Sequence, residues 1–164
     1  MGVVVSIVGP TASGKTELAV ALAQHLQTEI VNADARQVYQ GMSIGTAHPS
    51  AEELAGAKHH FVDFLPPSEL FSTGTFDAQV VPVLSELCTE HGSAVLAGGS
   101  GMYVEAALRG LDPLPADLVV RTALNARLKE EGLTALMDEL RTLDPTHAER
   151  MDTSNPQRVV RALE

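Results

Sequence analysis

A chain of 164 residues, 45% of them hydrophobic, can bury one core with a small appended lobe and is too short for two full-sized domains. Its 11 Lys and Arg against 21 Asp and Glu give a formal charge of −10, which excludes a surface that holds nucleic acid by bulk attraction, so any nucleic-acid site must be local. The single cysteine, Cys88, excludes an internal disulfide. The apolar run at the N-terminus is too short for a secretory signal or a membrane span. We therefore expect a cytoplasmic protein without membrane contacts.

The first two-thirds of the chain alternates between strand and helix patterns, which is typical of a parallel sheet covered on both faces. Apolar runs predict four strands, at residues 3–8, 29–34, 59–65 and 93–97. The first of these strands is expected to be buried on both faces. A narrow apolar stripe predicts a helix after it, through Leu18, Leu22 and Leu26. Another helix is predicted at residues 76–90, where Pro82 should introduce a kink or delay the start.

The pattern changes after residue 110. Residues 111–164 lack a strand-like apolar run and are rich in helix formers, with helix breakers at Pro113, Pro115, Gly132, Pro145 and Pro156. We predict several short helices here, which form a lobe separate from the sheet. Asn155 is a good N-cap for the last helix, and Pro156 suits its first position. Because that helix is so short, we expect the lobe to be incomplete.

Residues 7–19, IVGPTASGKTELA, contain the string Gly-x-x-x-x-Gly-Lys-Thr between a strand and a helix. Gly9 and Gly14 allow backbone N–H groups to point inward, and the start of the helix favours negative charge. Lys15 adds a charge for the outer phosphates, and the hydroxyl of Thr16 suits a phosphate-bound Mg²⁺. With the strand and helix pattern, this loop predicts an α/β fold in which a P-loop NTPase-like parallel sheet, flanked by helices, occupies residues 1–110.

The loop predicts a bound polyphosphate but does not specify a reaction. An ATP-consuming enzyme also needs an Asp at a strand end, for which Asp34 and Asp63 are candidates, and an arginine-rich lid, which does not follow. The stretch Gly98-Gly99-Ser100-Gly101 fails as a dinucleotide fingerprint because Val104 stands where the third glycine belongs. Asp34 should face the phosphate loop, where a carboxylate can bind Mg²⁺, accept a proton or cap a turn.

Two further sets of residues have open interpretations. His59 and His60 are adjacent on a predicted strand, where their side chains point to opposite faces, so they cannot easily hold one metal ion and a structural role is favoured. Tyr103 and Phe71 are candidates for the lining of an apolar pocket, although ordinary core packing explains both as well.

Five strings appear in a characteristic order: GPTASGKTELA, VNADARQVYQGMSIGTAHPS, HHFVDFLPP, AGGSGMYVEAALRGL and NPQRVVRALE. In order and spacing they resemble the tRNA dimethylallyltransferases, which place an isopentenyl group on the exocyclic amine of an adenine next to the anticodon. The resemblance covers essentially the whole chain, and several of the strings are rare outside that family. Ala35 departs from the usual Ser, and Ser100 from the usual Thr. The family also continues well past residue 164.

The resemblance implies that the loop holds a prenyl diphosphate instead of ATP. The diphosphate of dimethylallyl diphosphate would contact Gly9, Pro10, Thr11, Ala12, Ser13, Gly14, Lys15 and Thr16. Lys15 and a Mg²⁺ ion on Thr16 would stabilise the leaving group. Asp34, in its ionised form, would accept a proton from the adenine amine, with the hydroxyl of Ser100 beside it. The implied product is tRNA modified at the adenine 3′-adjacent to the anticodon, in tRNAs that read codons beginning with U.

The resemblance also implies local contacts with the tRNA anticodon stem-loop. They would come from Asp34, Ala35, Arg36, Gln37, Ser100, Arg121, Gln157, Arg158, Val159, Val160 and Arg161. Because Ala35 lacks a hydroxyl, Arg36 and Gln37 remain as the polar readers of the target nucleotide. Arg121 is expected to reach substrate, with both diphosphate and tRNA open as its target. Residues 111–164 would then be an incomplete tRNA-binding lobe.

Three alternatives stay open beside this hypothesis. A P-loop kinase or nucleotide phosphotransferase is disfavoured by the missing arginine lid. Prenyl transfer to a free adenine nucleotide is disfavoured by the string QRVVR, which is useful only on a larger RNA. The short chain could also bind tRNA or diphosphate without catalysis. The sequence does not determine the oligomeric state, and a monomer is favoured.

Overall fold

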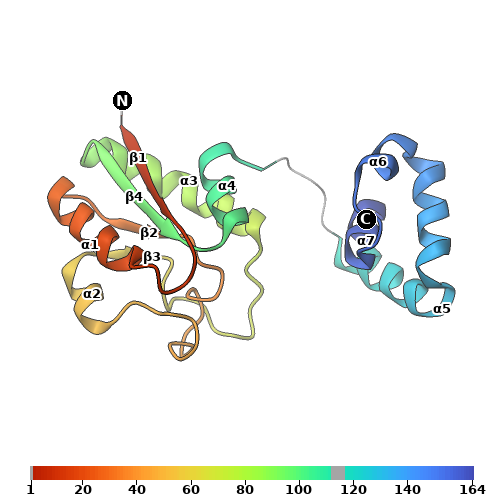
Figure 1. Ribbon diagram of the computed structural model, residues 1–164, viewed down its shortest axis with the longest axis horizontal. Coiled ribbons are helices and arrows are strands. Elements are labelled where there is room, and N and C mark those ends of the chain that lie inside the picture. The colour runs from red at the N-terminus through yellow and green to blue at the C-terminus, as the bar shows by residue number, and fades with distance from the viewer. Residues whose placement is uncertain (1, 112–116) are drawn as a thin grey trace. The chain divides into compact units, whose positions relative to one another are not determined.

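A computed structural model describes residues 2–111 and 117–164 of the protein (Figure 1). The chain divides into two compact units, an α/β unit at Met1–Asp112 and a helical unit at Pro113–Glu164. Within the described residues, no helix combines the length and the apolar character needed to cross a membrane.

The α/β unit is built on a four-stranded parallel sheet in the order β1-β4-β2-β3. Its strands are β1 (Val3–Val8), β2 (Ile30–Asn32), β3 (His59–His60) and β4 (Ser93–Gly98). The register of β1 against β4 runs from Val3 opposite Ser93 to Val8 opposite Gly98. The predicted P-loop NTPase-like parallel sheet is therefore confirmed.

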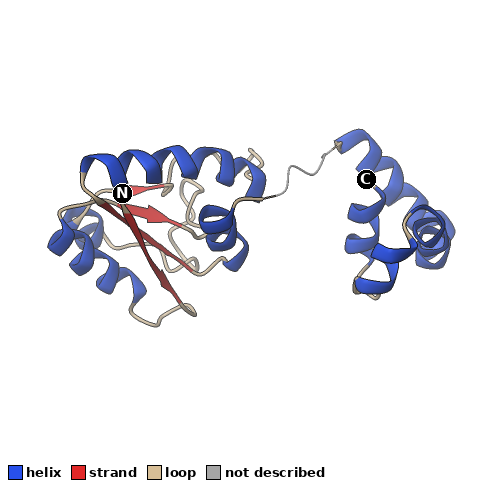
Figure 2. Ribbon diagram, turned by 90° about the horizontal axis from the view of Figure 1, so that it is seen from above, coloured by secondary structure: helices blue, strands red, loops and turns tan. Residues whose placement is uncertain are grey.

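Helices cover both faces of this sheet (Figure 2). They are α1 (Lys15–Leu26), α2 (Ala51–Gly56), α3 (Thr73–Glu90) and α4 (Gly101–Arg109). The buried strand β4 connects the two layers because its side chains alternate between faces. Leu96 packs in the core formed with α3 and α4, whereas Val95 packs with Ala19 and Ala23 of α1. Phe71 and Tyr103 belong to the first core, where the ring of Tyr103 stacks on Phe76 at 4.3 Å between centroids.

Three predictions for the α/β unit need correction. Strand β1 is not buried on both faces: Val3 is 60% exposed and Val8 58% exposed, because β1 is an edge strand with β4 as its sheet neighbour. Strand β3 stops after two residues, since Phe61 and Asp63 adopt positive φ values of 59° and 49° that break regular pairing. Helix α3 begins at Thr73, before the predicted start, and Pro82 lies inside it, so the proline does not delay the start.

The helical unit contains α5 (Leu118–Leu143), α6 (Pro145–Arg150) and α7 (Pro156–Leu163). Gly132, with φ 82° and ψ 170°, interrupts α5, and Pro145 and Pro156 begin the next two helices, as predicted. Asn155 caps α7 by accepting a hydrogen bond from the N–H of Gln157 at 3.0 Å. The core of this unit consists of Leu124, Leu136, Leu140, Val159 and Val160. The predicted breaks at residues 113 and 115 lie outside the described residues.

Candidate functional site

The phosphate loop connects the end of β1 to the start of α1. Its sharp turns use positive φ values at Ala12 (62°) and Gly14 (78°). The hydroxyl of Ser13 donates to the carbonyl of Pro10 at 2.8 Å, and the ammonium group of Lys15 donates to the same carbonyl. Residues 11–16 all line a cavity of about 320 Å³. The N-terminus of α1 and a lysine make this wall suitable for an anion.

The opposite walls of this cavity come from the carboxyl ends of neighbouring strands. Asn32 ends β2 and Asp34 follows it, and Gly98 ends β4 and Gly99 follows it. These ends meet at one edge because the strands are parallel. The sequence also gave Asp63 as a candidate for the strand-end carboxylate. Asp63 does not line this cavity. Its Oδ2 atom lies 2.9 Å from Nε2 of His48 instead. Asp34 is therefore the strand-end carboxylate that faces the loop.

A close backbone approach fixes Asp34 next to Ser100. A Cβ atom added to Gly98 would lie 2.2 Å from the carbonyl oxygen of Ala33, so only glycine permits this spacing. The N–H of Ala33 donates to Ala97 at 2.8 Å, and the N–H of Ser100 donates to Ala33 at 3.1 Å. The hydroxyl of Ser100 then accepts from the N–H of Ala35 at 2.9 Å. Hydrogen bonds thus join the string that contains Asp34 to the string that contains Ser100, and both strings are predicted to contact substrate.

A second cavity, of about 490 Å³, lies beside the first. Its lining contains Ala35, Arg36 and Ser100 together with glycines and threonines. Thr11, Asp34 and Gly99 line both cavities. Asp34 therefore lines both the cavity that the phosphate loop borders and the cavity that contains the hydroxyl of Ser100 and the exposed Arg36. Such an arrangement can hold an anion on one side and a proton-donating group on the other.

The carboxylate of Asp34 also organises its own turn by accepting from the N–H of Arg36 at 3.0 Å. Gln37, which the sequence grouped with Arg36 as a polar reader, is only 8% exposed. Its amide group donates to the carbonyls of Thr46 at 3.1 Å and Ala47 at 2.9 Å. Gln37 thus holds the loop at residues 46–47 against the cavity, while Arg36 remains exposed to solvent.

His48, Glu53 and His59 also line the first cavity, and the sequence did not predict them there. His48 and His59 belong to two of the quoted strings and Glu53 to none, but the strings alone did not indicate that these side chains line the cavity. Nδ1 of His59 lies 2.8 Å from the carbonyl of Ala57, and burial lowers the pKa of this imidazole. His60 faces Glu29 instead, at 2.5 Å, so the two adjacent histidines have different structural partners. Within residues 2–111 and 117–164, no group of His, Cys, Asp and Glu side chains could hold a metal ion.

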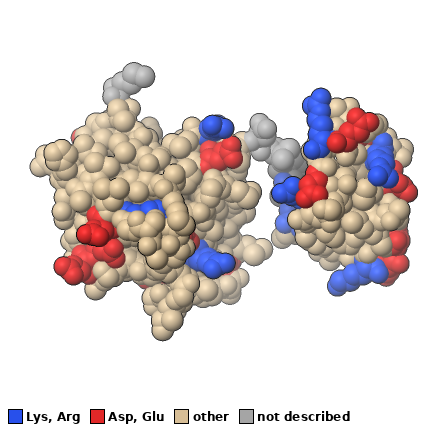
Figure 3. All heavy atoms as spheres, viewed as in Figure 1, with Lys and Arg blue, Asp and Glu red and all other residues tan. Residues whose placement is uncertain are grey.

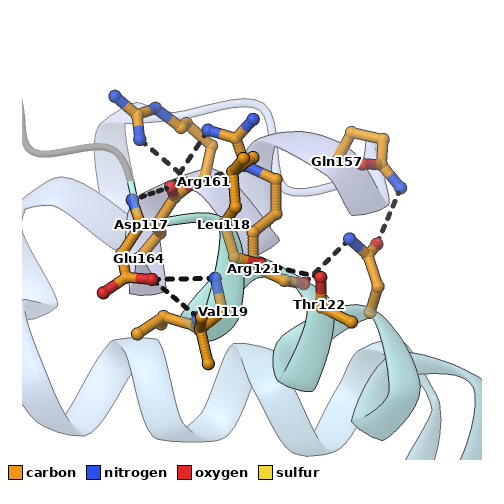
Figure 4. Close-up of polar contacts among 10 residues, drawn as sticks. Asp117, Leu118, Val119, Arg121, Thr122, Gln157, Arg161 and Glu164 are labelled. Carbon is orange, nitrogen blue, oxygen red and sulfur yellow. Dashed lines mark hydrogen bonds and ion pairs between the residues drawn. The ribbon is translucent and has the colours of Figure 1, made fainter.

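In the helical unit, Arg121 and Arg161 meet the carboxylate of Glu164 (Figure 4). Nε and Nη2 of Arg121 donate to Glu164 at 2.8 and 3.0 Å, and Nη1 of Arg161 lies 3.0 Å from it. The side-chain hydrogen bond from Arg121 is the main cause that lowers the pKa of Glu164 to about 2, and the same bond raises the pKa of Arg121. Arg121 therefore lies in a polar cluster on the helical unit.

The string at residues 157–161 divides between surface and core. Gln157 and Arg158 are exposed, and Arg158 lies 3.6 Å from Asp152. Val159 and Val160 are 0% and 1% exposed, and their side chains pack in the core of the helical unit. Their contact with tRNA stays a prediction. On a helix these two positions face opposite the exposed residues of the same turn.

Charge is distributed unevenly between the two units. Residues 1–112 contain 4 Lys and Arg against 12 Asp and Glu, whereas residues 113–164 contain 7 against 9. Side chains of both signs are interspersed over the helical unit in the view of Figure 3. The acidic total of the chain therefore comes mainly from the α/β unit, and the helical unit is close to neutral.

The fold and the loop define an α/β protein of the P-loop class with a second cavity beside the phosphate site. Residues 37–164 match the sequence profile of the family described as IPP transferase. The chain belongs to this family. It is 44% identical over 161 residues to a tRNA dimethylallyltransferase of Christiangramia forsetii, covering 98% of this chain and 53% of that protein. It is 48% identical over 166 residues to the tRNA dimethylallyltransferase of Bifidobacterium longum, covering 98% and 51%.

Solved structures are also similar to this chain. The full-length tRNA isopentenylpyrophosphate transferase from Bacillus halodurans is 41% identical, with a TM-score of 0.64, over 99% of this chain and 54% of that chain. A eukaryotic dimethylallyltransferase acting on tRNA has a TM-score of 0.79 over 98% of this chain and 40% of that chain; at 23% identity this likeness concerns the fold alone. The chain thus spans about half the length of the relatives it matches.

Proposed function

We propose that the protein transfers a dimethylallyl group from dimethylallyl diphosphate to the exocyclic amine of an adenine in tRNA. The observation that carries this proposal is the position of Asp34 on the boundary between the two cavities. A kinase needs its phosphate donor and acceptor to meet at a phosphorus atom. Prenyl transfer needs instead a base beside the attacking nitrogen and fixed donors beside the departing diphosphate. In this proposal the first cavity receives the diphosphate and the second receives the amine, with Asp34 between them.

The reaction replaces a C–O bond by a C–N bond and moves one proton from the amine to a base. The amine nitrogen bonds to the first carbon of the allyl group as the bond from that carbon to the diphosphate oxygen breaks. The bonding electrons leave with the diphosphate, and the amine proton passes to Asp34. Lys15 and the N–H groups of the phosphate loop stabilise the charge that develops on the leaving group. The hydroxyl of Ser100, fixed beside Asp34 through the N–H of Ala35, orients the amine.

The residues of the loop also fit a Mg²⁺ ion. The hydroxyl of Thr16 lines the same cavity as the rest of the phosphate loop. A hydroxyl is a hard oxygen ligand, which Mg²⁺ prefers when phosphate supplies its remaining ligands. The ion, when bound with the diphosphate, would add positive charge beside the leaving group.

The acceptor is proposed to be an anticodon stem-loop, with the target adenine 3′-adjacent to the anticodon in tRNAs that read codons beginning with U. An unstacked base fits a pocket with polar groups at its edges, and Arg36 and Ser100 supply such groups in the second cavity. The similarity to tRNA dimethylallyltransferases supports tRNA as the acceptor. A tRNA substrate also favours a cytoplasmic location.

The test is transfer of a labelled dimethylallyl group by the 164-residue chain to unmodified tRNA, with AMP as a parallel acceptor. Asp34→Asn removes the base and should abolish labelling, while diphosphate binding persists. Glu86→Gln, which removes a charge from an exposed position on α3, is the matched control and should label tRNA normally. Label on AMP but not on tRNA, ATP hydrolysis that follows a small-molecule acceptor, or no transfer by the chain would each overturn the proposal.

A further inference from the structure

His59 lines the first cavity and has one ring nitrogen without a partner among the described residues. Its Nδ1 atom lies 2.8 Å from the carbonyl oxygen of Ala57, which can only accept, so Nδ1 carries the hydrogen of the ring. Its Nε2 atom is buried and makes no hydrogen bond within the described part of the chain. In His48 and His60, by contrast, Nε2 lies beside a carboxylate, at 2.9 and 2.5 Å. The free Nε2 of His59 is therefore available to a ligand in the cavity.

The sheet places this ring on the same side as the phosphate loop. His59 pairs in register with Ile30 of β2, and Ile30 packs with Ala19 and Ala23 of α1. Paired residues of neighbouring strands point to the same face of a sheet, so the side chain of His59 lies on the face that α1 covers. The phosphate loop leads into the N-terminus of α1, and it lines the same cavity as His59.

The charged groups around this cavity are mostly acidic. The ionisable side chains that line it, among the described residues, are those of Lys15, Glu17, Asp34, His48, Glu53 and His59. With both histidines neutral, one positive charge faces three negative charges, a sum of −2. An anion with several charges is therefore repelled unless positive charge enters the cavity with it. Mg²⁺ is one source of that charge in the proposed function, and a proton on a histidine is another.

Burial keeps the imidazole of His59 neutral in the free protein. It is the main cause that lowers the pKa of His59 below its ordinary value of 6.5, and the charges of His48 and His60 act in the same direction. The hydrogen bond to Ala57 and the charge of Glu53 act in the opposite direction. A neutral ring with its hydrogen on Nδ1 presents only a lone pair at Nε2, which repels a phosphate oxygen. An anion in the cavity raises the pKa, and the proton that Nε2 then gains makes it a donor.

We propose that His59 is a further diphosphate-binding residue, which takes up a proton from solvent at Nε2 as the anion binds and then donates a hydrogen bond to a phosphate oxygen. The inference rests on the proposed function, in which diphosphate is the leaving group, and it adds a contact at that site. The diphosphate gains negative charge as the C–O bond breaks. An imidazolium beside it is therefore favoured more in the transition state than with the intact substrate.

Calorimetry with inorganic pyrophosphate, in two buffers of different ionisation enthalpy, measures the protons taken up on binding. At about pH 7.5, above the ordinary pKa of histidine, His59→Gln should take up about 0.5 to 1 proton fewer than wild type, because glutamine retains an N–H donor but does not titrate. Protons gained by pyrophosphate itself, at a fixed Mg²⁺ concentration, are common to both proteins and cancel. His60→Gln is the matched control: it changes the adjacent histidine, which faces Glu29, and should match wild type. Equal uptake by wild type and His59→Gln would overturn the proposal.

An NMR titration of the His59 ring tests the same point in the wild-type chain. Through-bond assignment identifies the ring without a variant, so the result does not depend on the folding of His59→Gln. The midpoint should lie below 6.5 in the free chain and rise by at least about one pH unit with saturating pyrophosphate. A midpoint that pyrophosphate leaves unchanged would refute proton uptake at His59 and leave the ring a structural role.

These measurements distinguish the role of His59 from the proposed function. Wild-type chain that binds no pyrophosphate would overturn both the role of His59 and the diphosphate site. Pyrophosphate binding with equal proton uptake in wild type, His59→Gln and His60→Gln would overturn the role of His59 alone. Proton uptake at His59 without dimethylallyl transfer to tRNA would support that role and contradict the proposed function.

Discussion

Replacement of Gly98 by alanine should disrupt the link between the strand ends of β2 and β4. The added Cβ would lie 2.2 Å from the oxygen, 2.3 Å from the carbonyl carbon and 2.8 Å from the Cα of Ala33. These are backbone atoms and cannot rotate away. The residue that follows Ala33 is Asp34, so any movement that relieves the clash also moves the proposed catalytic base.

The expected loss of stability in Gly98→Ala can be worked out from the hydrogen bonds that such a movement strains. An ordinary contact requires a separation of about 3.5 Å, so the two segments must move apart by about 1 Å. That movement disturbs the bond between Ala33 and Ala97 and the two bonds that join Ser100 to Ala33 and Ala35. Each of the three is worth about 1 kcal/mol net, and overpacking adds about 1 to 3 kcal/mol. We expect the free energy of unfolding to fall by about 4 to 6 kcal/mol, which is a large share of the stability of a typical domain.

Tyrosine fluorescence during denaturation by urea can report this loss. The chain has two tyrosines and no tryptophan, and both tyrosines, Tyr39 and Tyr103, lie in the α/β unit. The signal therefore follows that unit alone. Gly101→Ala is the matched control, since no atom lies within 4 Å of its added Cβ and Gly101 begins α4; its effect should stay within about 1 kcal/mol. Equal midpoints for Gly98→Ala and wild type would refute the reasoning, as would equal losses in the two variants.

Three further predictions concern single side chains. Lys15→Ala should weaken binding of inorganic pyrophosphate at least tenfold by calorimetry, because a charged hydrogen-bond donor is lost, and an unchanged affinity would remove Lys15 from the site. Ser100→Ala leaves the N–H of Ala35 without its acceptor and should lower the free energy of unfolding of the α/β unit by about 1 to 3 kcal/mol; no change in the urea midpoint would contradict that role. The folded pKa of Glu164, about 2, lies below its ordinary value of 4.5, so its contribution to stability is present above pH 4.5 and is lost as the pH falls towards 2. The difference in melting temperature between wild type and Glu164→Gln should therefore shrink over that range, and a constant difference would reject this linkage.

The phosphate loop and the strand-end carboxylate could be predicted because each depends on local sequence. Gly14 and Lys15 specify a turn and a charge within a few residues, and Asp34 follows a buried strand directly. Asn155 and Pro156 specify the start of α7 for the same reason. Such features can be predicted without knowing which distant residues they contact.

Other features depended on contacts between distant residues. The exposure of β1 depends on which strands are its neighbours, and an apolar run cannot reveal that it lies at an edge. The resemblance assigned Gln37 to contact with the target nucleotide, but its burial follows from the path of the loop at residues 46–47 and could not be predicted. Glu164 lies 43 residues from Arg121, so their ion pair has no local signature. In each case tertiary structure decided the outcome.

The edge position of β1 has a practical consequence for work with this chain. An edge strand presents backbone N–H and C=O groups that can pair with a strand of another molecule, and apolar edges promote aggregation. With Val3 and Val8 more than half exposed, β1 offers such a template within the described residues. Loss of soluble protein should therefore rise with concentration, and a lysine in place of Val3 on this strand would act as a gatekeeper that improves the yield of monomer.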